Sequence, residues 1–348
     1  MRYKLLGRSG LRVSELCLGT LTFGEDWGFG ASREECRAIF EAFTSAGGNF
    51  IDTACNYTFG SSEQIVGELV ASDRDRFVIG SKFTMTTNPK DPNRSGNHRK
   101  NLVTSVSASL KRLGTDYLDL LWLHQWDFTT SVEEVMRGLD DLVRSGKVLY
   151  VGVSDTPAWI ISRANMLADL RGWSPFAALQ LPYSLAERTA ERELLPMARE
   201  LDLAVTTWGA LAGGALSGKY AAGAPRPPGT RLFAGPFTEA LLTERNFAIA
   251  AVVAGVAAEI GQSPSTVALA WILHQRSIAQ LLPIVGARSA AQMKENLGAL
   301  ETKLSPEHLA RLDEATRVPL GFPHDFLVSE RGYLFGEVYP LLDNHRSR

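Results

Sequence analysis

The stretch Asn49-Phe-Ile-Asp-Thr-Ala-Cys-Asn-Tyr57 joins a short apolar run, which ends at its Asp, to a polar loop that carries the Tyr. Two further apolar runs follow along the chain, and they end in Lys82 and His124. Continuous apolar runs of this length are typical of strands that are buried on both faces of a parallel sheet. The ends of parallel strands in a barrel lie at one face, where active sites are built. The pattern therefore predicts that Asp52, Tyr57, Lys82 and His124 lie together at that face.

The alternation of strand-like runs and helical patterns extends along most of the chain. The expected strands are residues 13–18, 49–52, 77–82, 118–123, 148–153, 177–180, 203–207 and 281–285. The expected helices are residues 32–46, 61–71, 98–113, 131–146, 157–171, 189–201, 239–260 with 264–274, and 289–300. Eight strand–helix pairs predict an α/β fold of the (β/α)8 TIM-barrel type. Doubly wound folds also alternate strands and helices, so the count of eight and an N-terminal hairpin are what favour the barrel.

Both ends of the chain are expected to be additions to one barrel domain that spans residues 1–348. A Gly-Arg-Ser-Gly turn between short alternating runs predicts a β-hairpin within residues 1–15. An extra helix is expected at 305–317, and the tail at 318–348 has no clear period, so it either folds over the barrel mouth or serves in assembly. The Gly/Pro-rich stretch 209–237 interrupts the alternation, and long loops inside compact domains are usually functional.

Composition narrows the classes of function. Hydrophobic residues make up 45% and charged residues 21%, which is typical of a globular protein with a full core. The net charge of −2 argues against a nucleic-acid or anionic-membrane surface. Three Cys without a Cys-x-x-Cys pair suggest neither a disulfide framework nor a metal site, and Cys55 is expected to be a packing residue. Because no uncharged apolar run reaches about 18 residues and no signal peptide is recognised, we expect a cytoplasmic protein without a membrane span.

The four residues at the strand ends have the chemistry to polarise a carbonyl group. A Tyr phenol titrates near pH 10, and a Lys ammonium beside it is expected to lower that pKa. An Asp would hold the Lys charged, and a neutral His could orient the carbonyl oxygen. A residue of any of these four types, taken alone at such a position, more often serves in a turn, in packing or in contact with solvent. The hypothesis of a carbonyl-polarising site therefore depends on the four residues occurring together. On the barrel alone, a Schiff base on Lys82, as in an aldolase or isomerase, stays an alternative.

Three motifs resemble the Asp, Tyr, Lys and His tetrad of the aldo-keto reductase superfamily: Asp52-Thr-Ala-Cys-Asn-Tyr57, Gly80-Ser-Lys82 and Leu121-Trp-Leu-His124. Gly146-Lys-Val-Leu-Tyr-Val-Gly-Val-Ser154 is also similar, and the resemblance runs from about residue 3 to about residue 317. It is nearest to the aryl-alcohol dehydrogenase-like branch, which includes the potassium-channel β-subunits. The resemblance implies a reductase that transfers a hydride from NADPH to an aldehyde or ketone, with Tyr57 as general acid. It also implies an alternative, a cofactor-binding regulatory or sensor subunit with little turnover.

The Rossmann Gly-x-Gly-x-x-Gly fingerprint after a first strand is absent. The resemblance implies instead that NADP(H) binds extended across the strand ends. Residues 213–219 have the spacing of a Walker loop, but Tyr220 replaces its Ser or Thr, so we interpret them as a Gly-rich segment that approaches a pyrophosphate. The resemblance implies a set of cofactor-binding residues. The set is Gly19, Thr20, Ser154, Asp155, Gln180, Trp208, Gly209, Leu211, Gly213, Lys219, Gly286, Arg288, Gln292 and Asn296.

Several of these positions decide what the cofactor would be. Arg288 stands where the resemblance implies contact with an adenosine 2′-phosphate, which favours NADPH over NADH without excluding NADH. Asp155 departs from the usual Asn at the nicotinamide carboxamide, and an ionised Asp can accept but not donate a hydrogen bond there. Gly209 and Ala210 replace the usual Ser-Pro, which leaves the hydrogen bonding of that loop open.

Aromatic residues in the loops near the barrel mouth suit an apolar or aryl carbonyl substrate. Trp27 and Trp126 are the expected substrate contacts, and Trp126 is favoured because it follows His124 by two residues. The expected partner is therefore a small-molecule carbonyl compound. Its identity, the favoured direction of reaction and the oligomeric state are left open by the sequence.

Overall fold

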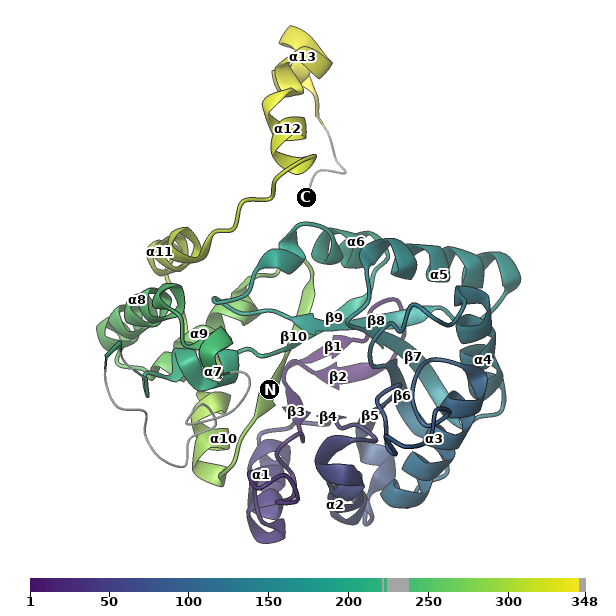
Figure 1. Cartoon of the computed structure of the whole chain (residues 1–348). Helices are drawn as coiled ribbons and strands as arrows, with labels where there is room; N and C mark the ends of the chain where they lie inside the picture. Colours follow the sequence, from purple (N-terminus) through teal and green to yellow (C-terminus); the bar gives the residue numbers. More distant parts are fainter. Residues whose placement is uncertain (221, 224–237, 344–348) are drawn as a thin grey trace.

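The chain folds as a closed barrel of parallel strands surrounded by helices (Figure 1). The structure is a computed structural model that describes residues 1–220, 222–223 and 238–343. The barrel strands, in spatial order, are β10 (Gln280–Gly286), β3 (Cys17–Gly19), β4 (Phe50–Asp52), β5 (Val78–Phe83), β6 (Leu118–Leu123), β7 (Val148–Ser154), β8 (Phe176–Pro182) and β9 (Ala204–Trp208). Strand β9 pairs with β10 and closes the barrel, so the predicted (β/α)8 fold is confirmed.

The surrounding helices follow the strands in the predicted order. They are α1 (Arg33–Ser45), α2 (Ser61–Val70), α3 (Arg99–Leu113), α4 (Val132–Arg144), α5 (Ala158–Arg171), α6 (Leu194–Glu200), α7 (Thr238–Leu241), α8 (Glu244–Ile260), α9 (Pro264–His274), α10 (Ala290–Leu297) and α11 (Pro306–Thr316). Ser131 caps α4 by accepting a hydrogen bond from the Glu134 amide, as expected of a Ser before a helix. Among the described residues no single helix is long and apolar enough to cross a membrane; α8 and α9, bent by 95°, meet that requirement only as a pair.

An N-terminal hairpin closes the end of the barrel opposite the predicted site. Strand β1 (Tyr3–Leu5) pairs antiparallel with β2 (Arg12–Ser14). The turn between them donates from the Arg8 amide to the Asp202 carbonyl, just before β9 begins. Leu6 and Val13 are fully buried against the side chains that fill the barrel interior. The predicted hairpin is therefore confirmed, and it plugs the barrel.

Some predicted boundaries were wrong for identifiable reasons. The strand expected at 13–18 is divided, because Ser14 pairs within the hairpin while the barrel strand begins at Cys17. The helix expected at 239–260 is broken after α7, because Thr243 caps a new helix by accepting from the Asn246 amide. The helix expected at 189–201 starts later, at Leu194, after the short 3-10 turn Thr189–Glu191.

Ser32 and Glu35 at the start of α1 have the Ser-x-x-Glu spacing of a capping box, but only half of the box forms. Ser32 accepts a hydrogen bond from the Glu35 amide. The Glu35 carboxylate does not return to Ser32 but accepts from the Ala290 amide at 2.6 Å. This carboxylate lies at the start of α10, where unpaired helix amides favour negative charge. The sequence pattern was right about the helix start, and the barrel packing determines the partner of Glu35.

The part of the tail that the structure describes, residues 318–343, does not fold over the barrel mouth. Helices α12 (His324–Ser329) and α13 (Arg331–Phe335) project away from the barrel (Figure 1). The tail is joined to the barrel near α6, where Arg192 donates to the Pro319 carbonyl and Glu193 pairs with His324. Its apolar side chains are largely exposed; Tyr333, for example, is 89% exposed.

Trp122 fills the middle of the barrel, below the predicted site, and two glycines make room for it. It is fully buried on β6, between Gly80 of β5 and Gly152 of β7. A Cβ atom at Gly152 would stand 2.4 Å from Trp122 Cε3, and one at Gly80 would stand 2.8 Å from Trp122 Nε1. These two positions therefore require glycine because of packing and not because of backbone conformation.

We expect Gly152→Ala to lower the free energy of unfolding by about 1–3 kcal/mol, the usual cost of overpacking a core. Urea denaturation would measure this loss. Gly255→Ala is a matched control, because it lies in the middle of α8 with no heavy atom within 4 Å of the added Cβ. That control should gain about 0.5–1 kcal/mol from helix propensity. Equal effects at the two sites would contradict the packing argument.

Candidate active site

Asp52 and Lys82 form a buried ion pair at the ends of two adjacent strands. Lys82 Nζ lies 2.5 Å from Asp52 Oδ2 and donates a second hydrogen bond of 2.7 Å to the Thr53 carbonyl. The side chains of Lys82 and Asp52 are 0% and 4% exposed. Asp52 is opposite Gly80 in the β4–β5 ladder, and Lys82, two residues further on, points to the same side of the sheet. The register of these two strands therefore creates the pair.

Tyr57 stands next to this pair, on the 3-10 turn Tyr57–Gly60 after β4. Lys82 Nζ lies 4.7 Å from the centroid of its ring. The ring of His124 lies edge-on to it with a centroid separation of 6.0 Å. All four residues that were expected to meet at the strand ends are thus brought together in one cluster.

Backbone strain in the turn fixes the direction of Tyr57. Thr58 and Phe59 have φ values of 44° and 53°, in the left-handed region that non-glycine residues rarely occupy. The Thr58 hydroxyl holds this conformation, since it donates to the Phe23 carbonyl and accepts from the Ser62 amide. Strained backbone of this kind clusters at functional sites. No feature of the sequence indicated this strain.

The pKa of Tyr57 differs from the expectation. Burial raises the pKa of Tyr57, and although the positive charge of Lys82 lowers it, the net pKa is raised above the ordinary value. Burial by itself lowers the pKa of Lys82, but the neighbouring Asp52 and Tyr57 outweigh burial, so the net pKa of Lys82 is raised. The predicted influence of the Lys is present, but the prediction of a lowered phenol pKa was wrong. Tyr57 therefore keeps its proton at neutral pH.

His124 is held neutral. Burial, and then the charge of Lys82, lower the pKa of His124 to about 3. Its Nδ1 atom is buried without a hydrogen-bond partner among the described residues. Burial raises the pKa of Cys55 to about 12, so its thiol stays protonated, as expected for a packing residue.

Gln180, one of the cofactor-binding residues that the resemblance implies, lies next to the ion pair. Its side chain is 2% exposed, and its Nε2 donates to Asp52 Oδ1 at 3.0 Å. The two oxygens of Asp52 are thus engaged by Gln180 and Lys82, respectively. Gln180 therefore supports the ion pair from β8, and its contact with a cofactor stays a prediction.

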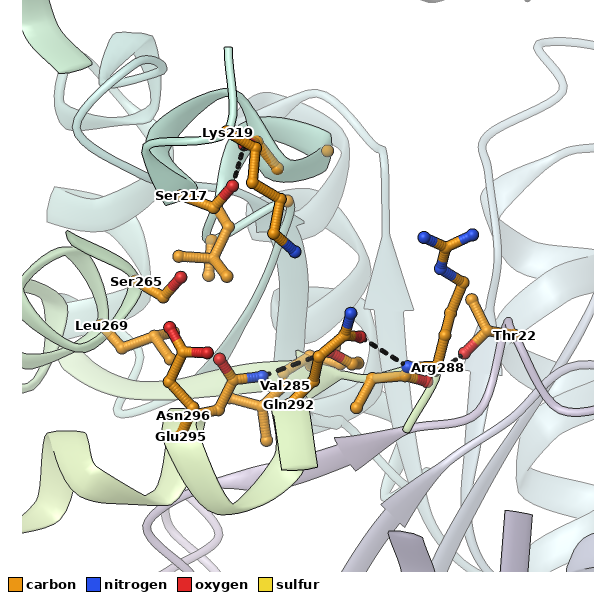
Figure 2. Close-up of a pocket in the computed structure, with 18 of the residues that line it drawn as sticks. Thr22, Ser217, Lys219, Ser265, Leu269, Val285, Arg288, Gln292, Glu295 and Asn296 are labelled. Carbon is orange, nitrogen blue, oxygen red and sulfur yellow. Dashed lines mark hydrogen bonds between the residues drawn. The ribbon is translucent and has the colours of Figure 1, made fainter. Parts of the chain in front are cut away.

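A cavity of about 180 Å³ lies at the ends of β9 and β10 (Figure 2). One wall is lined by Gly209, Leu211 and Gly213, which follow β9, and by Lys219. The other wall is lined by four predicted residues at and after the end of β10. Those four are Gly286, Arg288, Gln292 and Asn296. Figure 2 shows Lys219 and Arg288 extending into the opening from different segments of the chain.

Local hydrogen bonds shape the wall of the cavity after β10. The Gln292 side chain accepts from the Arg288 amide at 2.9 Å, and the Asn296 side chain donates to the Gly286 carbonyl at 3.3 Å. Gly213 and Gly214 have φ values of 65° and 105°, which only glycine adopts easily, so the opposite wall presents bare backbone. A cavity with glycine backbone and two cationic side chains fits a pyrophosphate and a further phosphate.

The cavity includes polar residues that the sequence argument missed. They are Thr22, Ser217, Ser265 and Glu295. Ser217 lies inside the Gly-rich segment 213–219, so its neighbours could have indicated it. Glu295 follows Gln292 by one helical turn and was detectable from that spacing. Ser265 begins a helix that is distant in sequence from the predicted motifs, and only the fold brings it here.

The other predicted cofactor residues lie outside this cavity. Thr20, which follows Gly19 at the end of β3, donates its hydroxyl to the Asp52 carbonyl and so serves the local structure. Ser154 ends β7, and its buried hydroxyl has no hydrogen-bond partner among the described residues. Trp208 ends β9 and donates from Nε1 to Asp155 Oδ1 at 3.3 Å. These side chains surround the mouth beside the tetrad.

The two tryptophans proposed as substrate contacts have different environments. The Trp27 ring lies edge-on to Tyr57 with a centroid separation of 6.4 Å, and it also contacts Phe29 and Phe59. Phe59 is 79% exposed, so these rings form an apolar wall open to solvent. Trp126, which the sequence favoured, is buried within the hydrophobic core. Trp27 is therefore the better placed of the two.

The chain is similar in sequence to known proteins of one family. Residues 15–317 match the model of the aldo/keto reductase family. The chain is 38% identical to norsolorinic acid reductase of Aspergillus flavus over 334 residues, which cover 93% of this chain and 83% of that protein. It is 37% identical over 338 residues to an aryl-alcohol dehydrogenase of Pestalotiopsis microspora, covering 94% of this chain and 85% of that protein.

The chain therefore belongs to the aldo/keto reductase family, and it is similar to the aryl-alcohol dehydrogenase-like branch of that family. It is an oxidoreductase that acts on the carbonyl groups of small molecules, as its family and the names of its relatives indicate. Members of this family use nicotinamide cofactors.

The depressed pKa of His124 makes acid stability a test of the site. A neutral His in the folded state takes up a proton on unfolding, because its unfolded pKa is about 6.5. The stability that this provides is complete above pH 6.5 and is lost as the pH falls toward 3. We expect wild type to lose about 2 kcal/mol more than His124→Gln between pH 7 and pH 4.5, measured by urea unfolding. Between pH 7 and 9 the difference between the two proteins should stay constant, and an equal loss in acid would show that His124 titrates normally.

Proposed function

We propose that the protein is an NADPH-dependent reductase of aldehydes or ketones in which Tyr57 is the general acid. The observation that supports this most is the convergence of Tyr57, Lys82, Asp52 and His124 in one buried cluster. A protonated phenol beside a buried ammonium can give its proton to a carbonyl oxygen that gains charge. A positive charge in a site of low dielectric also stabilises the developing oxyanion.

Each member of the cluster has a separate task in this proposal. Tyr57 holds the proton, since its pKa is raised by burial. Lys82, oriented by Asp52, stabilises the phenolate that remains after transfer. His124 is neutral, so it can hydrogen-bond to the carbonyl oxygen without adding a second positive charge next to Lys82. Gln180 is a positioning residue for Asp52.

The cofactor assignment is supported by the cavity at the ends of β9 and β10. A bound reduced nicotinamide would supply the hydride, which no side chain carries. Ser154, with its unpaired buried hydroxyl, and Asp155 would hold the nicotinamide end near Tyr57. Gly213, Lys219 and Arg288 would hold the phosphates.

An aryl carbonyl compound is the substrate class that we favour. The open wall of Trp27, Phe29 and Phe59 rings stands next to Tyr57, where the substrate must bind. Two groups of relatives are named for norsolorinic acid and for aryl alcohols. These observations favour an aromatic substrate over a sugar or a small aliphatic aldehyde.

Removing the phenolic hydroxyl should abolish most of the activity. We expect Tyr57→Phe to lower kcat for 4-nitrobenzaldehyde by about 10²–10⁴-fold, the usual contribution of a general acid. Loss of NADPH absorbance measures the rate, and NADPH binding should be nearly unchanged. Tyr117→Phe is the control, because its hydroxyl pairs with Asp75 at the surface.

Equal turnover of wild type and Tyr57→Phe would contradict the role of Tyr57. NADPH binding without turnover of any carbonyl tested would instead favour the sensor function. Borohydride trapping of a substrate on Lys82, without need of NADPH, would favour Schiff-base chemistry.

Cofactor preference should depend on Arg288. We expect Arg288→Ala to raise the Kd of NADPH about 10–100-fold while changing that of NADH less than about threefold, because only NADPH carries the 2′-phosphate. Fluorescence titration would measure both constants. Lys294→Ala removes a nearby cation of the same helix region that does not line the cavity, so it should leave the ratio unchanged. A similar loss for both cofactors would show that the 2′-phosphate is bound elsewhere.

A further inference from the structure

Asp155 is an acidic group at the mouth that the tetrad chemistry does not use. It follows β7 directly and has a φ of 40°, in the left-handed region that Asp and Asn tolerate better than most residues. Its carbonyl accepts from the Trp126 amide, and its carboxylate accepts from Trp208 Nε1. The side chain is thus held between the ends of β7 and β9, on the rim of the site.

The negative charge of Asp155 acts on the catalytic cluster itself. Burial raises the net pKa of Asp155, while the Trp208 N–H and the charge of Lys82 favour its ionised form. The ionised carboxylate is in turn one of the influences that raise the pKa of Tyr57. Three charged groups act on Tyr57: Lys82 is positive, and Asp52 and Asp155 are negative. Lys82 and Asp52 neutralise each other in a direct ion pair. Asp155 therefore leaves this end of the site with an uncompensated negative charge.

Any nicotinamide that reacts at Tyr57 must lie close to this charge. The hydride donor has to stand about 3–3.5 Å from the carbonyl carbon, while Tyr57 contacts the carbonyl oxygen. Asp155 lies at the same face, because its carbonyl accepts from the amide of Trp126, two residues after His124. Its carboxylate accepts from Trp208 at the end of β9. A ring placed beside Tyr57 would therefore lie near Asp155. In the reaction, a hydride leaves the reduced ring for the carbonyl carbon and a proton leaves Tyr57 for the oxygen, giving an alcohol and an oxidised ring.

The two redox forms of the cofactor differ in charge at this ring and nowhere else. The oxidised nicotinamide carries one positive charge, and the reduced ring is neutral. Their phosphates, adenine and carboxamide are the same, so contacts to those groups change both affinities alike. An anion beside the ring stabilises the oxidised form selectively.

We propose that Asp155 strengthens the binding of NADP⁺ relative to NADPH and so favours, on the enzyme, hydride transfer from the reduced ring to the carbonyl compound. The inference rests on the proposed function, because it needs the nicotinamide at the tetrad. It explains what an Asp contributes where an Asn could also hold a carboxamide. Asp155 is in this sense a residue that determines specificity for the redox state.

The test is the ratio of two dissociation constants, Kd of NADPH over Kd of NADP⁺, for wild type and Asp155→Asn. The substitution removes the charge, keeps the shape and suits the left-handed backbone. At pH 8 we expect the ratio to fall by about five- to tenfold in the variant, since one charge pair at short range in a partly exposed site is lost. Isothermal titration calorimetry measures both constants without turnover, and a thermal melt checks the fold of the variant.

Glu295→Gln is the matched control. It removes one negative charge from the cavity wall near Arg288, where NADP⁺ and NADPH are identical. Both affinities should change by the same factor, and the ratio should stay at the wild-type value.

The possible results separate the two proposals. A lower ratio in Asp155→Asn alone supports the inference. The bias toward NADP⁺ is wrong if wild type binds both cofactors and the ratio is unchanged in Asp155→Asn, and it is also wrong if that variant binds neither form. In both cases the proposed function stands. If wild type binds neither form, the proposed function fails first.

Discussion

The buried ion pair between Lys82 and Asp52 is the interaction on which the rest of the site depends. Removing two charges from water is costly, and their attraction offsets that cost only when the remaining hydrogen bonds are also satisfied. Here the Thr53 carbonyl and the Gln180 amide satisfy them. Because these partners come from β4 and β8, the pair requires a barrel that is closed and in register. By this reasoning the ion pair contributes little to the net free energy of unfolding. Its main effect is on the electrostatic environment of the Tyr57 phenol.

The sequence predicted the fold well because a barrel depends on repetition. Eight apolar runs separated by helical patterns leave few arrangements, and the run that ends at Asp52 already indicates strands buried on both faces. The failures occurred where three-dimensional packing overrides a local pattern. Ser14 joins the hairpin, and Glu35 turns to the start of α10, because partners distant in sequence are available there.

The candidate site was predictable in its members but not in its energetics. Strand ends brought together Asp52, Tyr57, Lys82 and His124, as the motif spacing indicated. The direction of the pKa shift of Tyr57 was not predictable, since burial is a property of the whole fold and exceeds the effect of one neighbouring charge. A motif indicates which residues lie together but not which atoms they contact, so the hydrogen bond from Gln180 to Asp52 was not predicted.

The tryptophan in the middle of the barrel also governs how protons reach the site. Trp122 occupies the interior under the tetrad, and its Nε1 is buried with no hydrogen-bond partner among the described residues. Below it, Leu120 and Phe50 are fully buried and the hairpin closes the end. A chain of water molecules would need several polar groups along such a route, and among the described side chains Phe50, Leu120, Leu6 and Val13 below Trp122 offer none. After Tyr57 has given up its proton, it must therefore be reprotonated from the solvent side. The product leaves and the proton returns through the same opening of the barrel.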